Sequence, residues 1–369
     1  MAVATPEAHL LAASLVFNLS IGGSYMETVP ATDVAASFSQ RNGPLARVQH
    51  ILHRYPTLSP GFVLVVASIV FTIFGHGKFQ QLGTIGTILR QTAVLASLAI
   101  GQTLIVLTAG IDLAVGTGML LSHLVVAKLA FDSGWPPFLA LAAGAIVAMT
   151  LGGVHGLLVT KLGLPPFIVT LGTFYVFQSL GLIYSQARTI SKNELGGENS
   201  VLLWMGKQVK IGSMPINRGV IVVFLMYVVF SFILSNTAWG THVYSIGDDR
   251  EAARLAGINV TRVLISVYLV AGFLYAFGGW VQLGRSLSAS SNAAVDINLE
   301  TITAVVIGGT SLFGGRGRLS GTLVGALIVQ VLRLGLSLAD VSPYWQNFAI
   351  GLLIIVAVTL DQWIRRVAK

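Results

Sequence analysis

Residues 240–263 read GTHVYSIGDDREAARLAGINVTRV and form a polar segment between two apolar spans. Asp248, with Glu251 three residues later, fits a capping box, so we expect Asp248 to be the N-cap of a short helix. Gly257 stands where a helix closes in the left-handed conformation, and Ile258 supplies the apolar residue that often follows. About eight residues are too few for a helix that is stable alone in water. The segment is therefore either a solvated connector or a rigid knob held between membrane helices.

The composition of the chain is that of a membrane protein. Of its 369 residues, 54% are hydrophobic and only 10% are charged, whereas soluble domains carry about 25% charged residues. The formal net charge of +8 is better explained by cations flanking membrane spans than by nucleic-acid binding. The chain has no cysteine, which excludes disulfides, iron–sulfur clusters, zinc–thiolate sites and thiol catalysis.

About ten apolar spans follow one another along the sequence and predict an all-α polytopic membrane protein with about ten transmembrane helices. The short turn AGIDLAVG (109–116) joins the second span to the third, so we expect these two helices to be antiparallel neighbours. The spans cover residues 60–75, 92–108, 113–130, 137–159, 166–184, 220–234, 264–283, 297–312, 319–336 and 345–360.

The first 43 residues differ from the rest of the chain. Their apolar run, 10–21, is shorter than the roughly 20 residues that span a bilayer. No Lys or Arg precedes Arg41, so the segment lacks the basic start of a signal peptide. We expect residues 1–43 to be a disordered leader, with a peripheral amphipathic segment as the alternative, and residues 44–369 to form one transmembrane domain.

The basic residues bear on orientation. Lys and Arg divide almost evenly between the two sides of the predicted helices, but the short basic segments GGRGR (314–318) and RRVAK (365–369) fall on one side together with 248–257. Because basic short ends favour the cytoplasm, we expect that side, and both termini, to be cytoplasmic.

Small residues recur at four-residue intervals inside the spans. Gly110, Ala114, Gly118 and Ser122 would share one helical face, and 152/156 and 321/325 are GxxxG pairs. Such faces let helix backbones approach closely in lipid, either within one chain or between two copies. The turns 110–116 and 309–315 both fit G-x-[DS]-L-x-x-G, which suggests an internal repeat of the kind found in transporters.

No catalytic or metal-binding set emerges from the sequence. None of the seven histidines stands at metal-ligand helical spacing from a carboxylate or another histidine, so we expect all seven to be structural. The chain also has no G-x-x-x-x-G-K-[ST] phosphate loop. A membrane enzyme lacks support, and any ATP-driven motor must belong to another subunit.

Polar residues inside the spans are mostly uncharged, which suits a neutral, hydrogen-bonding solute and offers no obvious proton relay. Asp112 is expected to cap the third span from the cytoplasmic side, and Glu300 to interact with the dipole of the eighth. Each Thr can instead bond to its own helix backbone. The candidate substrate-pathway residues are Gln102, Thr103, Thr108, Asp112, Thr170, Thr173, Gln178, Glu300 and Thr301.

Four segments together resemble the membrane permeases of bacterial sugar ABC importers of the ribose type. They are TLIVLTAGIDLAVG (103–116), LPPFIVTLGT (164–173), GDDREAARLAGINVTR (247–262) and ITAVVIGGTSLFGGRG (302–317). The likeness extends from about residue 43 to the end of the chain. Within this branch, residues 235–266 and 350–369 look most like the fructose-transport permeases.

The resemblance implies an inner-membrane permease that pairs with a second copy of itself, a cytoplasmic ATP-binding cassette subunit and a periplasmic sugar-binding protein. ATP and Mg would be bound by the cassette subunit, with no cofactor in this chain. The cargo would be a monosaccharide, with fructose first and ribose-like pentoses next; the rival interpretation is a stand-alone facilitator or secondary carrier. The residues that the resemblance assigns to ATPase coupling are Asp248, Asp249, Arg250, Glu251, Ala252, Ala253, Arg254, Leu255, Ala256 and Gly257.

Overall fold

The computed structural model describes residues 58–75, 77–191, 201–212, 214–291 and 296–367. All of them belong to the second of the two units into which the chain divides, 1–54 and 55–369. The leader predicted for residues 1–43 lies outside the described residues.

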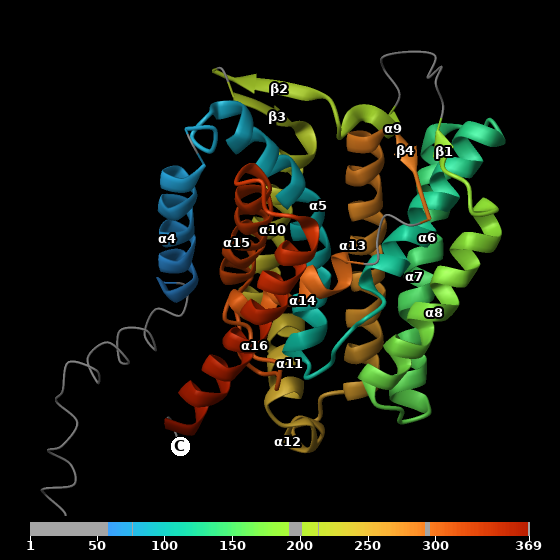
Figure 1. Ribbon diagram of the computed structural model, residues 1–369. Coiled ribbons are helices and arrows are strands. Elements are labelled where there is room, and N and C mark those ends of the chain that lie inside the picture. Colours follow the sequence, from blue (N-terminus) through green and yellow to red (C-terminus); the bar gives the residue numbers. More distant parts are fainter. Residues whose placement is uncertain (1–57, 76, 192–200, 213, 292–295, 368–369) are drawn as a thin grey trace, which may run out of the picture. The chain divides into compact units, whose positions relative to one another are not determined.

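The second unit is a bundle of helices, and each of the ten predicted spans overlaps a helix, although the span 297–312 extends beyond the end of its helix at Ile307 (Figure 1). Seven stretches of the described chain are long and apolar enough to cross a membrane: α5 (Leu82–Leu107), α6 with its π-helical end (Val115–Asp132), α7 (Pro137–Lys161), α8 (Pro166–Ser185), α10 (Arg218–Asn236), α13 (Val260–Ser286) and α15 (Leu319–Leu338). The remaining predicted spans correspond to α4 (Leu58–Phe74), α14 (Ile297–Ile307) and α16 (Pro343–Val367). The all-α polytopic architecture is confirmed, and ten full crossings remain a prediction.

Short elements mark the two ends of the bundle. At one end, strands β2 (Gln208–Ile211) and β3 (Met214–Asn217) form an antiparallel hairpin, near α9 (Val201–Trp204) and the two-residue pair β1 (Ile190–Ser191) with β4 (Ser288–Ala289). At the other end, α11 (Ala238–Asp248) leads into α12 (Arg250–Leu255). We call these the hairpin end and the α12 end; α13 runs from the second to the first (Figure 1).

Local sequence explains where several helices begin. α7 and α8 start at Pro137 and Pro166, whose fixed φ suits the first turn and whose missing N–H has no helical partner to lose. Thr237 caps α11 and Asn259 caps α13, each accepting a backbone N–H with its side-chain oxygen (3.2 and 3.0 Å).

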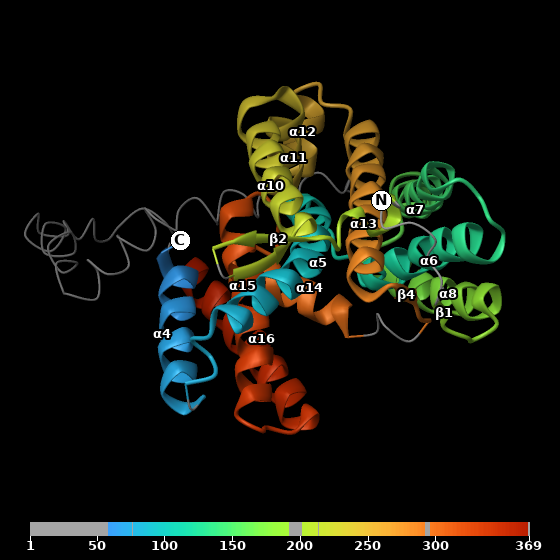
Figure 2. The ribbon, with the colours of Figure 1, turned by 90° about the horizontal axis from the view of Figure 1, so that it is seen from above.

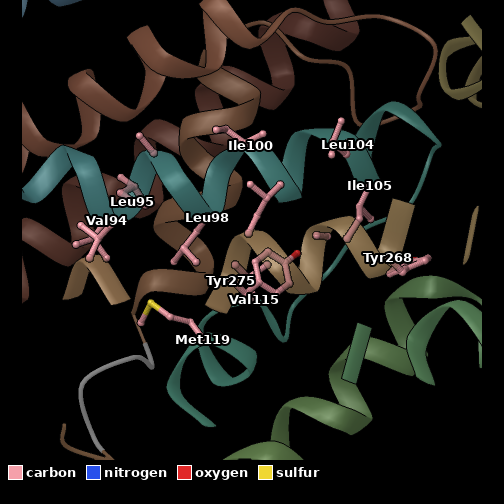
Figure 3. Close-up of a cluster of buried hydrophobic side chains, with 14 of the residues drawn as sticks. Val94, Leu95, Leu98, Ile100, Leu104, Ile105, Val115, Met119, Tyr268 and Tyr275 are labelled. Atoms are coloured by element: carbon pink, nitrogen blue, oxygen red, sulfur yellow. The ribbon is translucent and has the colours of Figure 1, made fainter. Parts of the chain in front are cut away.

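Helix α13 lies at the centre of the bundle, between α7 on one side and α5 on the other (Figure 2). Small residues permit this close packing: a Cβ added at Gly152 of α7 would overlap the Tyr268 carbonyl, and one at Gly272 would overlap that of Ala148. Tyr275 of α13 lies between α5 and α6, among their aliphatic side chains (Figure 3). The GxxxG pair at 152/156 therefore packs within the chain, as does the pair at 321/325, which contacts Ala304 of α14 and Gly308 just after that helix.

The expectation that α5 and α6 pack against each other as neighbours is wrong, although the two helices do run in opposite directions. After α5 the chain turns at Ala109, which has a positive φ of 60°, and α6 begins only at Val115. A Cβ added at Gly101 of α5 or at Gly118 of α6 would contact Tyr275, at 2.8 and 3.5 Å respectively. Both helices thus pack on α13, and the residues between them form an irregular linker along it.

The predicted four-residue face is also only partly helical. Gly110 lies outside α6 and instead donates its N–H to the Ile105 carbonyl (3.1 Å), closing the end of α5. The first turn of α6 lies beside the middle of α13, because Gly118 is in contact with Tyr275. A helix that begins inside the bundle leaves irregular backbone at membrane depth, which is tolerated only where protein or water satisfies it.

Candidate functional site

Helix α12 is a short helix with both ends capped by its own sequence. Asp249, not Asp248, is the N-cap: its carboxylate accepts the N–H groups of Glu251 (2.9 Å) and Ala252 (3.0 Å). The prediction of Asp248 was wrong by one residue, because α11 continues through Asp248 and leaves Asp249 as the first extended position. The physical device is the one expected, a carboxylate on the free N–H groups of the first turn.

The other end of α12 closes as predicted. Gly257 has a φ of +84°, and its N–H and that of Ile258 donate to Arg254 and Ala253 (3.0 and 3.1 Å), the two bonds of a Schellman motif. Nine of the ten candidate coupling residues are exposed, and only Ala253 faces the bundle. Leu255 is 89% exposed, the highest value among the exposed large hydrophobic side chains of the described residues. α12 is a rigid knob with an uncovered apolar tip.

A tight junction connects this knob to the rest of the bundle. Gly247, in the last turn of α11, lies so close to the end of α5 that a Cβ there would overlap the Leu107 carbonyl and lie 2.6 Å from the nitrogen of Gly315. The N–H of Gly315 donates to that same Leu107 carbonyl (3.0 Å). The Tyr244 hydroxyl donates to the carbonyl of Gly317 (2.9 Å). We call these contacts the Gly247 junction; they join α11, the end of α5 and the loop 308–318.

The junction also explains the two similar turns in the sequence. Gly314 of the second turn lies against Ala109 at the start of the first, so close that a Cβ added at Gly314 would lie 2.8 Å from the Ala109 nitrogen. The two turns therefore meet at the α12 end rather than at opposite ends of the bundle. The first turn follows α5 and leads into α6, and the second follows α14 and leads into α15.

The first turns of α6 and α14 meet inside the bundle. The N–H of Gly116 donates to Oδ1 of Asn298 (2.6 Å), and both residues are buried. α14 itself has only 11 residues, too few to cross a bilayer. Discontinuous helices that begin at membrane depth are where transporters commonly bind their cargo.

Asp112 lies beside this meeting point and is fully buried. Its Oδ1 accepts the N–H of Ala114 (2.7 Å), and its Oδ2 accepts the hydroxyl of Tyr275 (2.9 Å). The expectation that Asp112 caps the third span from the cytoplasmic side is wrong: Ala114 is the N-cap of α6 and has no side-chain cap bond. Tertiary packing of the linker against α13 buries the carboxylate instead.

His155 of α7 completes this buried polar cluster. Its Nδ1 lies 3.9 Å from Oδ2 of Asp112, and its Nε2 lies 2.6 Å from the Thr173 hydroxyl. The ring of Tyr268 lies edge-on to that of His155, and its hydroxyl has no hydrogen-bond partner among the described residues. His155 thus has a carboxylate neighbour that residue spacing along one helix cannot reveal. The two tyrosines of the cluster, Tyr268 and Tyr275, are seven residues apart and therefore lie on one face of α13.

Five of the other predicted pathway residues fall into three groups. Thr103 pairs with Thr322 of α15 (2.9 Å), which links two helices. Thr108, Thr170 and Thr301 donate to carbonyls of their own helices, and Thr170 also reaches the carbonyl of Ile111 in the linker (3.1 Å). Gln178 lies half-buried on α8, apart from the cluster.

Gln102 stands out among them. It is fully buried in α5, and neither its amide nitrogen nor its amide oxygen has a hydrogen-bond partner among the described residues. A buried amide without partners is costly, about 1–3 kcal/mol for each unmade bond. Such a group calls for water or a hydroxyl-bearing solute.

Glu300 belongs to a buried ion pair that the sequence pattern did not predict. It pairs with Arg333 of α15 and accepts a hydrogen bond from the Gln330 amide (3.3 Å). Asp112 and Glu300, the two charged candidates in the spans, are therefore both buried. Arg333 could have been found, because it is the only Lys or Arg between Arg318 and Arg365, and a lone cation in an apolar span needs a partner.

We expect Glu300→Gln and Arg333→Gln each to destabilise the protein more than the double variant does. Either single change leaves one charge unpaired, and the coupling should be about 1–3 kcal/mol, below that of a fully buried pair, because the Arg333 side chain is 30% exposed. Thermal unfolding of the four proteins in detergent measures this coupling. Additive losses would show that the pair contributes nothing.

Comparison with known proteins places these features in a family. Residues 84–358 match the family described as "Branched-chain amino acid transport system / permease component". The fructose import permease FrcC of Rhizobium meliloti is 45% identical over 338 residues, covering 92% of this chain and 94% of the relative. No solved structure matches.

Two further relatives extend the range of named cargoes. The ribose import permease RbsC of Haemophilus influenzae is 35% identical, covering 82% of this chain and 92% of the relative. The D-allose permease AlsC of Escherichia coli is 31% identical, with 83% and 91% covered. With its seven long apolar helices, this chain is a multi-pass membrane protein of the branched-chain amino acid transport system / permease component family.

Proposed function

We propose that this chain is the permease subunit of an ATP-driven importer of a monosaccharide, fructose first and ribose-like pentoses next, in the bacterial inner membrane. The observation that carries the proposal is the 45% identity to a fructose import permease across 92% of the chain. The ribose and allose permeases are less similar, at 35% and 31%. The order of these identities is the reason for placing fructose first.

The proposed assembly contains a second copy of this chain, a cytoplasmic ATP-binding cassette subunit that binds ATP and Mg, and a periplasmic sugar-binding protein. α12 is the proposed docking element for the cassette subunit, because it is capped, rigid and carries the exposed Leu255. The α12 end is then cytoplasmic, and α16 ends on that side (Figure 1). The basic segment 314–318 is also joined to it through the Gly247 junction, in agreement with the placement of cations inside.

The proposed mechanism is alternating access driven through the Gly247 junction. Closure of the cassette subunits displaces α12, and the backbone contacts of Gly247 pass this displacement to the end of α5 and the loop 308–318. These two segments lead directly to the broken helices α6 and α14, whose first turns meet at Gly116 and Asn298. A rigid-body shift of this kind can expose the pathway to one side and then to the other.

We expect Glu251→Ala and Gly257→Ala to uncouple ATP hydrolysis from uptake while the protein still inserts. Glu251 pairs with Arg254 on the exposed face of α12 (2.9 Å), and a Cβ at Gly257 strains its left-handed backbone by about 1 kcal/mol. Sugar uptake and ATPase activity of the assembled complex measure this. Unchanged uptake in both variants would remove α12 from the coupling mechanism.

Uptake of labelled fructose and ribose in cells lacking only this chain tests the function itself. Loss of fructose uptake alone, restored by the chain, is the expected result. Loss of neither would reject both sugars. Transport by the chain alone in vesicles, without a cassette subunit, would instead establish a facilitator or secondary carrier.

A further inference from the structure

A polar pocket of about 190 Å³ lies at the hairpin end, opposite to α12. It is bounded by the start of α5, the end of α13 and the β2–β3 hairpin. Two arginines line it, Arg90 of α5 and Arg285 of α13, and most of the other lining residues carry amide side chains. We call it the outer arginine pocket. Its lining residues are Thr87, Arg90, Gln91, Gly206, Gln208, Asn217 and Arg285.

The two guanidinium groups lack an acidic partner in the described part of the chain. Arg90 donates to the Thr87 hydroxyl (2.9 Å), and Arg285 donates to the Gln282 amide oxygen (3.0 Å). No carboxylate of a described residue lies within ion-pair distance of either. Two like charges that face one small pocket repel each other, so a negative charge placed between them relieves that repulsion.

Asn217 provides a second sign that the pocket awaits a ligand. The residue is only 8% exposed, and its Oδ1 has no hydrogen-bond partner among the described residues. An unmade hydrogen bond at a buried amide is costly. A ligand that brings both a carboxylate and a neighbouring N–H group, as an acidic residue of a protein does, satisfies the arginines and Asn217 together.

We propose that the outer arginine pocket receives an acidic side chain of the sugar-binding protein when that protein docks. The proposal rests on the proposed function, because the hairpin end is periplasmic only if α12 is cytoplasmic. Arg218, which directly follows the hairpin, adds positive charge at the same end. This charge would steer an acidic surface toward the pocket and accelerate docking.

The position of the pocket argues against an anionic lipid as the occupant. It lies at the ends of α5 and α13, the two helices at the centre of the bundle (Figure 2). In each of the lipid-facing helices α7, α8 and α10, only 22% of the apolar span is buried. No residue of these three helices lines the pocket, because Asn217 precedes α10 as its N-cap. A binding protein that approaches along the bundle axis meets the hairpin end first, where the pocket lies.

The test is a charge reversal, Arg90→Glu with Arg285→Glu, in the permease–cassette complex reconstituted in lipid nanodiscs. The probe is the sugar-loaded binding protein of the same importer, and its affinity is measured by interferometry at low and high salt. We expect the double variant to lose about 10- to 100-fold in affinity, and the wild-type affinity to fall with salt. Lys78→Glu, a charge reversal at an exposed lysine beyond α4, is the matched control and should bind as the wild type does.

The outcomes separate this proposal from the proposed function. If the wild-type complex couples ATP hydrolysis to uptake and the double variant binds with unchanged affinity, the docking proposal is overturned while the function stands. A double variant that loses co-purified phosphatidylglycerol but keeps its affinity for the binding protein would make the pocket a lipid site and equally overturn it. The double variant Arg90→Lys with Arg285→Lys retains both positive charges. The proposal therefore requires this variant to bind the sugar-binding protein more tightly than the charge-reversal variant does. A folding defect common to all pocket variants would weaken binding equally in both.

Discussion

Gly247→Ala is expected to reduce sugar uptake by about tenfold or more while the protein still inserts. Alanine is a better helix former than glycine by about 1 kcal/mol, so propensity alone predicts a small gain in stability. The new Cβ, however, would overlap the Leu107 carbonyl and crowd the Gly315 nitrogen. Both are backbone atoms of other segments and cannot turn aside, and overpacking of this kind costs about 1–3 kcal/mol. The Gly247 junction must therefore open to accommodate the added Cβ. Each 1.4 kcal/mol by which this favours one transport state over the other changes the ratio of the two states about tenfold.

The matched control is Gly172→Ala in α8, where an added Cβ meets nothing within 4 Å. This variant should transport as the wild type does.

Tyr244→Phe tests the junction more gently, because it removes only the hydroxyl bond to Gly317, a loss of about 1 kcal/mol. Burial raises the pKa of the Tyr244 hydroxyl, although nearby Arg318 opposes this, so the group remains a protonated donor at neutral pH. Wild-type uptake in Gly247→Ala would show that the junction does not transmit the motion of α12.

Asp112→Ala is expected to cause the largest loss of stability among these substitutions. It leaves the Tyr275 hydroxyl and the Ala114 N–H without their acceptor, and each orphaned buried donor costs about 1–3 kcal/mol. The linker that sets the start of α6 would also lose its attachment to α13. Thermal unfolding in detergent, followed by the tryptophan signal, measures the effect.

Two further variants make the Asp112 result interpretable. Asp112→Asn keeps one oxygen acceptor and should lose clearly less than the alanine variant. Asp296→Ala makes the same change at an exposed aspartate whose side chain caps no N–H, and it should be nearly neutral. Equal stability of Asp112→Ala and Asp296→Ala would mean that the buried cluster does not hold the linker.

Hydropathy alone located the helices. Each apolar span had to become a helix, because in lipid only helices and closed barrels satisfy every backbone polar group. The sequence likewise placed α12 to within one residue, since a carboxylate N-cap and a left-handed Gly257 are local devices. The GxxxG pairs 152/156 and 321/325 are also local patterns. They predict close helix packing but do not show which helix each pair packs against.

The sequence by itself therefore determined the helical membrane architecture, the capped knob of α12 and the absence of a phosphate loop. Tertiary structure alone decided that α13 separates α5 from α6, that Asp112 is buried between Tyr275 and His155, and that Arg333 reaches Glu300. The physical reason is range. Hydropathy and caps depend on residues within a few positions of one another, whereas these pairings join residues from 33 to 163 positions apart, and no periodicity in a single sequence encodes which distant helices meet.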